Sequence, residues 1–327
     1  MPGSPVILVT GGAGFIGSNL VAHFADRADV VVCDRLDHDD RWRNIADCDV
    51  ADLVAAADLA DFLAGNAGQI DIVVHMGAIS STTERDVDLI MRTNLKLPQD
   101  LWRWCARNDS RLIYASSAAT YGDGAVGFDD DETALARLRP LNPYGWSKHL
   151  FDRWVQRTLA AGQAHPSQWA GLKFFNVYGP NEEHKGSMRS VVRQVAPVAK
   201  VGQAVPLFRS HRPGVADGAQ SRDFVTVADC VGVVDWLVRN ASVNGLYNVG
   251  TGEARTFADL AKAVFTALGR EPRVEYVDIP AAIRDRYQYF TQAEIGKLRG
   301  AGYERPFTAL EDGVAAYVRH LDCAGAL

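Results

Sequence analysis

Three residues in the middle of the chain have the types and spacing of an acid–base group. Ser117 ends the segment RLIYASS, and Tyr144 and Lys148 lie four residues apart in YGWSK. On a helix these two side chains would lie one above the other. The lysine charge, together with the positive ring of a nicotinamide, can lower the pKa of the tyrosine from about 10 toward neutrality. Such a phenolate takes a proton from a substrate hydroxyl as hydride leaves its carbon, while Ser117 bonds the same oxygen.

A second lysine, Lys185, lies in the polar segment PNEEHKGSM, residues 180–188. A lysine in such a segment is usually a solvated surface residue. An enzyme that already has Tyr144 and Lys148 has no evident need for it. On its own, the segment favours the surface interpretation.

A glycine turn predicts a dinucleotide site near the N-terminus. In TGGAGFIG, Gly11 permits a tight turn, Gly14 lets the backbone approach a pyrophosphate, and Gly17 lets a helix pack on a strand. The first turn of the following helix then offers free N–H groups to the phosphates. Asp34 ends the second predicted strand, where it would bond the adenosine ribose.

The residues after the second strand bear on the choice of cofactor. Asp34 by itself favours NAD, because its carboxylate bonds ribose hydroxyls. Arg35 follows directly and Arg41 is close by, and a guanidinium suits a 2′-phosphate. We therefore predict NADP, with NAD as the alternative.

The elements that must position these residues alternate along the chain. Short apolar runs predict strands over 5–10, 30–34, 71–78, 111–117 and 170–177, and helical periodicity covers 14–27, 52–64, 86–107 and 144–161. Apolar strands alternating with helices predict an α/β fold with a doubly wound parallel Rossmann sheet. We assign residues 1–178 to this NADP-binding domain. Residues 179–327 are predicted to form a smaller C-terminal α/β substrate-binding lobe, with some interleaving of segments and helices near 227–239, 256–268, 291–299 and 308–321.

Composition narrows the class of protein. The 327 residues carry a formal net charge of -6 without a basic stripe, which argues against nucleic acid as a partner. Five scattered cysteines lack metal-ligand spacing, so no metal is predicted. We found neither a leader pattern nor an apolar run of membrane-spanning length. The sequence predicts a cytoplasmic protein with no membrane partner.

The motifs together resemble a known family. TGxxGxxG, the serine strand and YxxxK are similar to those of the extended short-chain dehydrogenase/reductases. FFNVYGPNEEHKGSM, SRDFVTVADC, YNVGTGEARTF and RYQYFTQAEIGKLRGAGYERPF further resemble the ADP-glyceromanno-heptose 6-epimerases over nearly the whole chain. That resemblance implies an isomerase that interconverts two C6″ epimers of an ADP-linked heptose for lipopolysaccharide core synthesis. It also implies tightly held NADP and a homo-oligomer such as a pentamer.

The resemblance gives Lys185 a role. Inverting a carbinol carbon requires removal of hydride, turning of the keto intermediate and return of hydride to the other face. The oxygen then occupies two positions, and one acid–base group cannot reach both. In the family a tyrosine and a second lysine share this work, and the matching residues here are Tyr144 and Lys185.

The resemblance also implies two sets of binding residues. The cofactor set, beyond Tyr144 and Lys148, is Gly11, Gly14, Phe15, Ile16, Gly17, Asp34, Arg35, Arg41, Met76, Gly77, Ala78, Ser80, Asn94 and Val177. The substrate set is Ser117, Asn176, Ser187, Gln194, Phe208, Arg209, Ser210, His211, Arg222 and Tyr287. The sequence departs from the family at Met76, Ala56 and Gln194 and in a longer loop at 212–221. These departures bear on the cofactor and the nucleotide rather than on the chemistry.

Other functions stay open at this point. A C4 epimerase or dehydrogenase of the same fold is the nearest alternative, although it would not need Lys185. A 4,6-dehydratase is disfavoured because Ala118 and Ala119 follow Ser117 where that reaction needs an acid pair. A non-catalytic cofactor-binding protein is disfavoured because it has no use for two bases.

Overall fold

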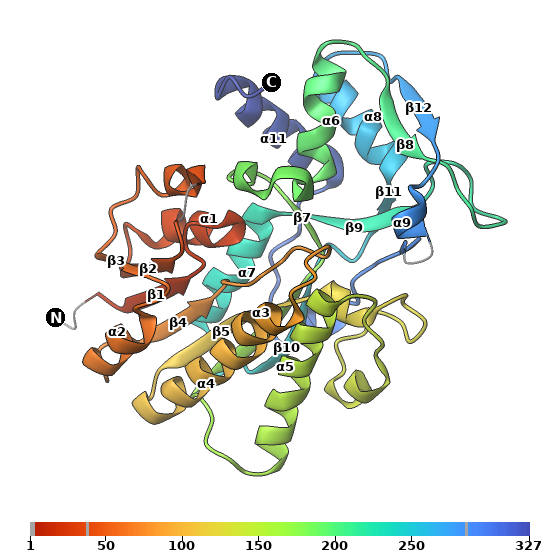
Figure 1. Cartoon of the computed structure of the whole chain (residues 1–327). Helices are drawn as coiled ribbons and strands as arrows, with labels where there is room; N and C mark the ends of the chain where they lie inside the picture. The colour runs from red at the N-terminus through yellow and green to blue at the C-terminus, as the bar shows by residue number, and fades with distance from the viewer. Residues whose placement is uncertain (1–3, 37–38, 285–286) are drawn as a thin grey trace.

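Seven parallel strands form the main sheet of the computed structural model, which describes residues 4–36, 39–284 and 287–327 (Figure 1). The strands lie side by side in the order β10-β6-β5-β4-β1-β2-β3. The predicted doubly wound α/β fold is therefore confirmed. In chain order the strands are β1 (Val6–Thr10), β2 (Asp29–Asp34), β3 (Asp52–Ala55), β4 (Ile72–His75), β5 (Arg111–Ser117), β6 (Trp169–Phe174) and β10 (Gly245–Val249).

The strand order sets the position of a ligand crevice. The chain builds outward from β1 through β2 to β3, and then restarts at β4 on the other side of β1. In open α/β sheets, ligands bind beyond the carboxyl ends of the strands at this reversal. The glycine turn follows β1 and the segment 76–80 follows β4, so both lie at that point.

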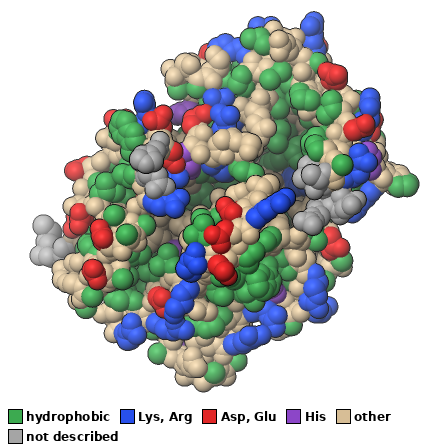
Figure 2. All heavy atoms as spheres, in the orientation of Figure 1, with side chains coloured by type: hydrophobic (Ala, Val, Ile, Leu, Met, Phe, Trp, Pro, Cys, Tyr) green, Lys and Arg blue, Asp and Glu red, His purple; other side chains and the backbone are tan. Residues whose placement is uncertain are grey.

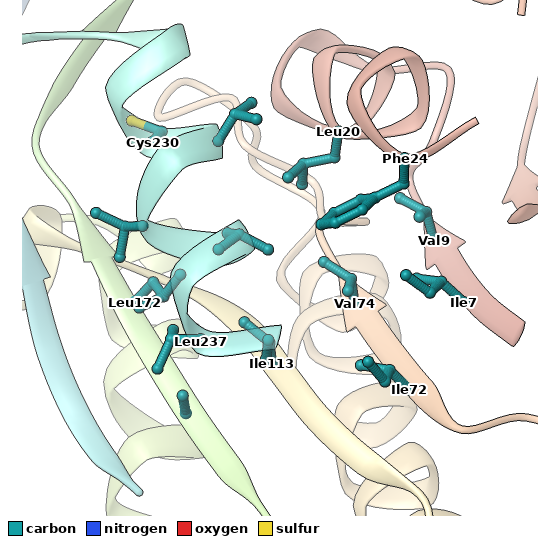
Figure 3. Close-up of a cluster of buried hydrophobic side chains, with 14 of the residues drawn as sticks. Ile7, Val9, Leu20, Phe24, Ile72, Val74, Ile113, Leu172, Cys230 and Leu237 are labelled. Carbon is teal, nitrogen blue, oxygen red and sulfur yellow. The ribbon is translucent and has the colours of Figure 1, made fainter. Parts of the chain in front are cut away.

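Helices cover both faces of the main sheet and bury its strands, except for the edge strand β3, which is mostly exposed. One core lies between the sheet and helices α1 (Phe15–Phe24) and α7 (Val227–Arg239), whose side chains Leu20, Phe24 and Leu237 meet those of the strands in Figure 3. A second core on the opposite face includes side chains of α2 (Leu59–Gly65), α4 (Leu97–Asn108) and α5 (Pro143–Ala160). Burial on both faces explains why the strands are nearly continuous apolar runs.

The smaller lobe has a core of its own. It packs α6 (Val191–Lys200), α8 (Phe257–Ala267) and α11 (Leu310–Cys323) against β8 (Val205–Phe208), which pairs with β12 (Val274–Val277). A three-stranded sheet of β7 (Asn176–Tyr178), β9 (Ser221–Thr226) and β11 (Ala254–Thr256) runs between this lobe and the main sheet (Figure 1). The remaining helices are α3 (Val87–Met91), α9 (Ala281–Arg284) and α10 (Gly296–Gly300), with a π-helix η2 (Arg92–Lys96) and 3-10 helices η1 (Asp40–Asn44), η3 (Ala118–Tyr121), η4 (Glu132–Arg137) and η5 (Glu183–Met188).

Two elements beyond residue 178 lie in the main sheet and its cover. Strand β10 pairs with β6 at the edge of the seven-stranded sheet, and α7 packs against α1. The two parts of the chain are therefore interleaved in space rather than cut at one residue.

Some predicted elements differ from the structure. Residues 52–55 form β3 rather than the start of a helix, because pairing with β2 and burial of Val54 outweigh the helix propensity of an alanine-rich segment. The helix expected over 86–107 contains the π-turn η2, and the helix expected from residue 291 begins at Gly296. The strand expected over 170–177 breaks at Phe175, where the chain passes from β6 to β7.

Candidate active site

The carboxyl end of β5 and the first turns of α5 bring the catalytic candidates together. Asn142 caps α5 by accepting a hydrogen bond from the Gly145 N–H at 2.8 Å, so the helix begins just before Tyr144. Ser117 lies at the end of β5, and its hydroxyl interacts with that of Tyr144. One turn beyond Tyr144, the Lys148 ammonium donates to the Ala115 carbonyl at 2.8 Å.

Burial dominates the acid–base properties of this pair. It raises the pKa of Tyr144, while the hydrogen bond with Ser117 lowers it. Burial lowers the pKa of Lys148 to about 8, and the charge of Asp152 raises it. The expected lowering of the tyrosine pKa is therefore not a property of the chain alone, because that argument included the positive ring of a cofactor.

Asp152 continues the same face of α5 into the core. Its side chain is fully buried and pairs with the buried ammonium of Lys173 at 3.0 Å. The Ser116 hydroxyl donates to Asp152 at 2.7 Å, and Lys173 also donates to the Thr120 hydroxyl at 2.6 Å. This network joins β5, β6 and α5 directly behind Ser117 and Lys148.

A cleft of about 480 Å³ lies at the strand reversal. Its glycine turn has no room for side chains: a Cβ on Gly11 would lie 2.5 Å from the Gly77 nitrogen, and one on Gly17 would lie 2.0 Å from the Gly11 oxygen. Gly11 also has a φ of 69°, which favours glycine. A bare backbone at a helix N-terminus fits the pyrophosphate of a dinucleotide.

Asp34 fixes the far end of this cleft. One carboxylate oxygen accepts from the Ala13 N–H at 2.8 Å, and the other accepts from the Arg35 N–H at 2.7 Å. Arg41 approaches Asp34 at 3.5 Å and pairs more closely with Asp39. A carboxylate and two arginines, Arg35 and Arg41, therefore line the part of the cleft where an adenosine ribose would lie.

Asn94 holds the cleft together from behind. Its buried amide accepts from the Ile79 N–H at 2.8 Å, donates to the Ile79 carbonyl at 2.9 Å and donates to Ser147 at 3.0 Å. Ile79 belongs to the segment after β4, and Ser147 lies between Tyr144 and Lys148 on α5. Asn94 thus links one wall of the cleft to the catalytic helix without lining the cleft itself.

A second cavity, of about 640 Å³, opens between β7, α6 and β8. Its lining is largely apolar, with Phe208, Phe224 and Phe257 among its members. Arg222 crosses its floor, with its guanidinium 5.4 Å from the Tyr287 ring and 5.5 Å from that of Phe257. Figure 2 shows this face of the molecule hollowed between the main sheet and the smaller lobe.

Lys185 lies where the two cavities meet. It lines both of them, together with Phe175, Val177 and Met188. Its ammonium is 4.8 Å from the centre of the Phe15 ring, and burial lowers its pKa while the charge of Glu182 raises it. Lys185 is therefore half-buried at the meeting point of the two cavities, unlike the solvated lysine that the segment alone favours.

The residues just before Lys185 are hydrogen-bonded to α1, and Asn44 links them to the glycine turn. The Asn19 amide donates to the Pro180 carbonyl at 3.1 Å, and the Asn181 amide donates to the Ser18 hydroxyl at 3.0 Å. Asn44 donates to the Ala13 carbonyl at 2.9 Å and approaches the Asn181 carbonyl at 3.4 Å. These amides hold the start of the lysine segment against the first turns of α1.

Most of the predicted site residues line one of the two cavities. Those around the cofactor cleft are Gly11, Gly14, Phe15, Ile16, Gly17, Asp34, Arg35, Arg41, Met76, Gly77, Ala78, Ser80, Ser117, Tyr144, Lys148 and Val177. Those around the second cavity are Asn176, Gln194, Phe208, Arg222 and Tyr287.

Five predicted residues lie outside both linings. Asn94 supports the cleft from behind, as described above. Ser187 is exposed, and Arg209 pairs with Asp278 on the surface. The last two residues are Ser210 and His211. The Ser210 N–H donates to the Asp217 carboxylate, and the His211 N–H donates to the Tyr289 hydroxyl.

Sequence reasoning missed several lining residues. Met188 and His184 lie in HKGSM together with Lys185. Both would have been predicted on the assumption that the whole segment faces inward. Gln220 and Phe257 carried no local signal, because they reach the second cavity from separate elements of the smaller lobe.

Comparison with known proteins identifies the family. Residues 7–250 match the model of the NAD dependent epimerase/dehydratase family. The ADP-L-glycero-D-manno-heptose-6-epimerase of Nitratidesulfovibrio vulgaris (strain Hildenborough) is 51% identical over 318 residues, which cover 95% of this chain and 96% of that protein. The chain belongs to the ADP-L-glycero-D-manno-heptose-6-epimerase family. It is an isomerase, as the sequence predicted.

Solved structures agree with this assignment. The crystal structure of the Helicobacter pylori ADP-L-glycero-D-manno-heptose-6-epimerase superposes with a TM-score of 0.80 at 29% identity, covering 98% of this chain and 96% of that one. The Thermus thermophilus UDP-glucose 4-epimerase in complex with NAD gives a TM-score of 0.78 at 30% identity, covering 98% and 99%. Heptose 6-epimerases and 4-epimerases therefore share this fold, so the fold does not distinguish the two activities. The sequence relatives do, because they are heptose 6-epimerases.

Family membership and the geometry of the cleft agree on a nicotinamide cofactor. Among the described residues, no group of histidine, cysteine and acidic side chains is arranged to bind a metal. Within the described ranges, every helix falls short of the length and apolar character needed to cross a bilayer.

Replacing Asn94 should weaken the cleft more than it weakens the fold. Asn94→Ala removes both hydrogen bonds to the Ile79 backbone and one of the bonds of the buried Ser147 hydroxyl, so we expect a loss of about 1–3 kcal/mol of stability. Because one wall of the cleft is then free of α5, cofactor should dissociate at least about tenfold faster. Chemical denaturation and the release of fluorescent reduced cofactor measure the two effects. Asn66→Ala, which removes one bond to the Phe62 carbonyl at the end of α2, is the control and should leave cofactor release unchanged.

Proposed function

We propose that the protein interconverts the two C6″ epimers of an ADP-linked glycero-manno-heptose, using bound NADP. The observation that carries the proposal is the position of Lys185 at the meeting point of the two cavities. Family membership supports the same reaction. A nucleotide sugar lying in the second cavity would bring its sugar to Lys185 and to the cleft that holds Tyr144.

Two acid–base groups suit a reaction that inverts a carbon through a ketone. A nicotinamide held in the cleft at Gly11, Tyr144 and Lys148 would supply the hydride chemistry, removal from C6″ and return to the opposite face. Tyr144 takes the hydroxyl proton of one epimer and Lys185 that of the other, and each gives the proton back in the reverse direction. The intermediate is a 6″-keto sugar, so the hydride removed from the substrate is returned within one turnover. Such a turnover leaves Tyr144 protonated and Lys185 neutral, and passage of one proton from Tyr144 to Lys185 through solvent restores the starting state. Ser117 holds the oxygen near Tyr144, and Lys148 supports the phenolate from the next helical turn.

The lowered pKa of Lys185 suits this role. A lysine must lose its proton to act as a base, and burial makes the neutral amine accessible nearer to neutral pH. A solvated lysine would remain charged and would be a poor base.

The second cavity suits an adenosine diphosphate. Arg222 is buried and its guanidinium can hold a diphosphate in two-pronged fashion. The aromatic and aliphatic lining beyond it suits a purine ring. We assign Asn176, Gln194, Phe208 and Tyr287 to this cavity as substrate contacts. Ser187, Arg209, Ser210 and His211 remain predicted contacts of the sugar nucleotide.

A C4 epimerase of the same fold is the second candidate, since the likeness to the Thermus thermophilus enzyme extends over the whole chain. The position of Lys185, half-buried between the two cavities, argues for the 6-epimerase, because transfer at C4 needs a single base. The homo-oligomer implied by the resemblance stays a prediction, which light scattering of the purified protein tests.

Epimerisation should proceed without net oxidation. Purified protein with its bound cofactor should convert either C6″ epimer of ADP-heptose into the same mixture, because hydride leaves and returns within one active site. Chromatography of the epimers and the absorbance of reduced nicotinamide measure this together. Accumulation of reduced cofactor in step with substrate loss would instead identify a dehydrogenase. Turnover of a UDP-sugar at C4 without turnover of ADP-heptose would favour the second candidate.

Removing either base should separate the two half-reactions. Tyr144→Phe and Lys185→Met should each slow epimerisation by about 10²–10⁴-fold, the usual contribution of a general acid–base group. In single-turnover reduction of the bound cofactor, the two variants should prefer opposite epimers. Lys200→Met, which removes a lysine of the smaller lobe paired with Asp322, is the control. Epimerisation by Lys185→Met at the parent rate would remove Lys185 from the mechanism.

Arg35 should favour the phosphorylated cofactor. Arg35→Ala should weaken NADP binding more than NAD binding, by about 1–3 kcal/mol for a charge-assisted hydrogen bond. Titration of both cofactors into protein stripped of nucleotide measures the difference. Arg43→Ala, at an exposed arginine that pairs with Asp40, should change neither affinity. Equal losses for NADP and NAD in Arg35→Ala would overturn the assignment of NADP.

A further inference from the structure

Glu182 is a fully buried acidic residue that neither predicted set of binding residues includes. It lies three residues before Lys185, at the start of the segment that carries this lysine. A buried carboxylate is costly unless hydrogen bonds and charges compensate it. The hydrogen-bond partners of the Glu182 carboxylate therefore indicate its role.

The Glu182 carboxylate closes the lysine segment on itself. It accepts a hydrogen bond from the Ser190 hydroxyl at 2.6 Å and a short one from the Ser190 backbone N–H. Ser190 is the N-cap of α6, where its hydroxyl accepts from the Arg193 N–H at 3.3 Å. Residues 182 and 190 are thus fastened together, and Lys185 lies within the loop between them.

A tyrosine from the far end of the chain completes the site. The Tyr317 hydroxyl, on α11, donates to the Glu182 carboxylate at 2.9 Å. Burial and the charge of Glu182 raise the pKa of Tyr317, so the hydroxyl keeps its proton and remains a donor. The loop is therefore fixed to the core of the smaller lobe as well as to α6.

Besides Glu182, side chains at the end of the loop hold it: Arg189 donates to the Gly186 carbonyl at 2.8 Å, and Gln194 donates to the Arg189 carbonyl at 2.6 Å. The Lys185 N–H donates to the Glu182 carbonyl at 3.1 Å, and Gly186 follows with a φ of 54° that turns the chain. The remaining charged side chains of the loop pair with one another, Glu183 with Arg189 and Arg193. His184 lies toward Asn44 at the cofactor cleft. Glu182 is the carboxylate whose charge acts on Lys185.

We infer that Glu182, held by Tyr317, is a positioning residue. It fixes the position of Lys185 and supplies a negative charge that acts on the Lys185 ammonium. The inference rests on the proposed function, in which Lys185 exchanges a proton with one of the two epimers. Tyr144 lies on a different element and has no contact with Glu182 or Tyr317 among those described. Disturbing Glu182 should therefore affect one half-reaction and spare the other.

Two variants of the protein with its bound cofactor test this. Tyr317→Phe removes one hydrogen bond to Glu182 and keeps the ring, and Glu182→Gln removes the charge and keeps the shape. Both should lower kcat, by about threefold to tenfold in Tyr317→Phe and by at least about tenfold in Glu182→Gln, with KM for the nucleotide sugar unchanged. In single turnovers, the epimer whose reaction fails in Lys185→Met should be slowed, and the other epimer should react within about twofold of the parent rate. Tyr303→Phe is the matched control, because this buried hydroxyl has no hydrogen-bond partner among the described residues.

A second readout does not need turnover. Acetylation of Lys185 by acetic anhydride, followed by mass spectrometry, should be several-fold faster in Glu182→Gln than in the parent or in Tyr303→Phe. The reason is that loss of the carboxylate lowers the pKa of the ammonium and loosens the loop. Equal slowing of both epimers, or parent-like rates and labelling in both variants, would overturn the inference. A parent protein that does not epimerise ADP-heptose would overturn the proposed function instead, and the labelling would still decide the role of Glu182. If Glu182→Gln does not fold, Tyr317→Phe decides alone.

Discussion

The buried pair of Asp152 and Lys173 is the interaction on which the active site depends. Both side chains are inaccessible to solvent, and removing one partner of such a pair typically costs about 3–5 kcal/mol because the other is left uncompensated. The pair joins α5 to β6, and the Ser116 hydroxyl joins it to β5. The end of a strand and the start of a helix are thereby held at a fixed distance. The proposed action of Ser117, Tyr144 and Lys148 on one oxygen requires these two elements to stay together.

The two acid–base groups are held in place by different means. Tyr144 lies in the second position of a long regular helix, whose own backbone hydrogen bonds and Asn142 cap define where the side chain points. Lys185 lies in a short 3-10 segment with a kink at Gly186, where the backbone offers much less support. Side-chain hydrogen bonds supply the support that the backbone does not. Asn19 and Asn181 bond the start of the segment to α1, and the buried Glu182 carboxylate bonds its end at Ser190. An irregular segment can thus be as well fixed as a helix when its side chains are buried.

Local signals explain what the sequence could predict. The glycine turn, Asp34 and the Tyr144–Lys148 pair each depend on neighbours within one strand–turn–helix unit, so their spacing was enough to predict the cofactor cleft. Residues 52–55 were expected to be helical, because their pairing with β2 leaves no mark in an alanine-rich segment. The segment that carries Lys185 is hydrogen-bonded through Glu182 to Tyr317, which lies 135 residues beyond Glu182. Only the family resemblance pointed to that lysine, since contacts over such separations have no periodic signature in a single sequence.

The smaller lobe has a core separate from those on either face of the main sheet. Its helices and β8 form most of the wall of the second cavity, whereas the turn after β1, the end of β5 and the start of α5 line the cofactor cleft. Substitutions in that wall can therefore accumulate over evolution without disturbing the packing beneath Tyr144. Lineages that share the cofactor-binding part of the molecule are free to diverge in the nucleotide part of the sugar nucleotides that they bind. The two halves must stay compatible mainly at the few side chains that both cavities share, Phe175, Val177, Lys185 and Met188.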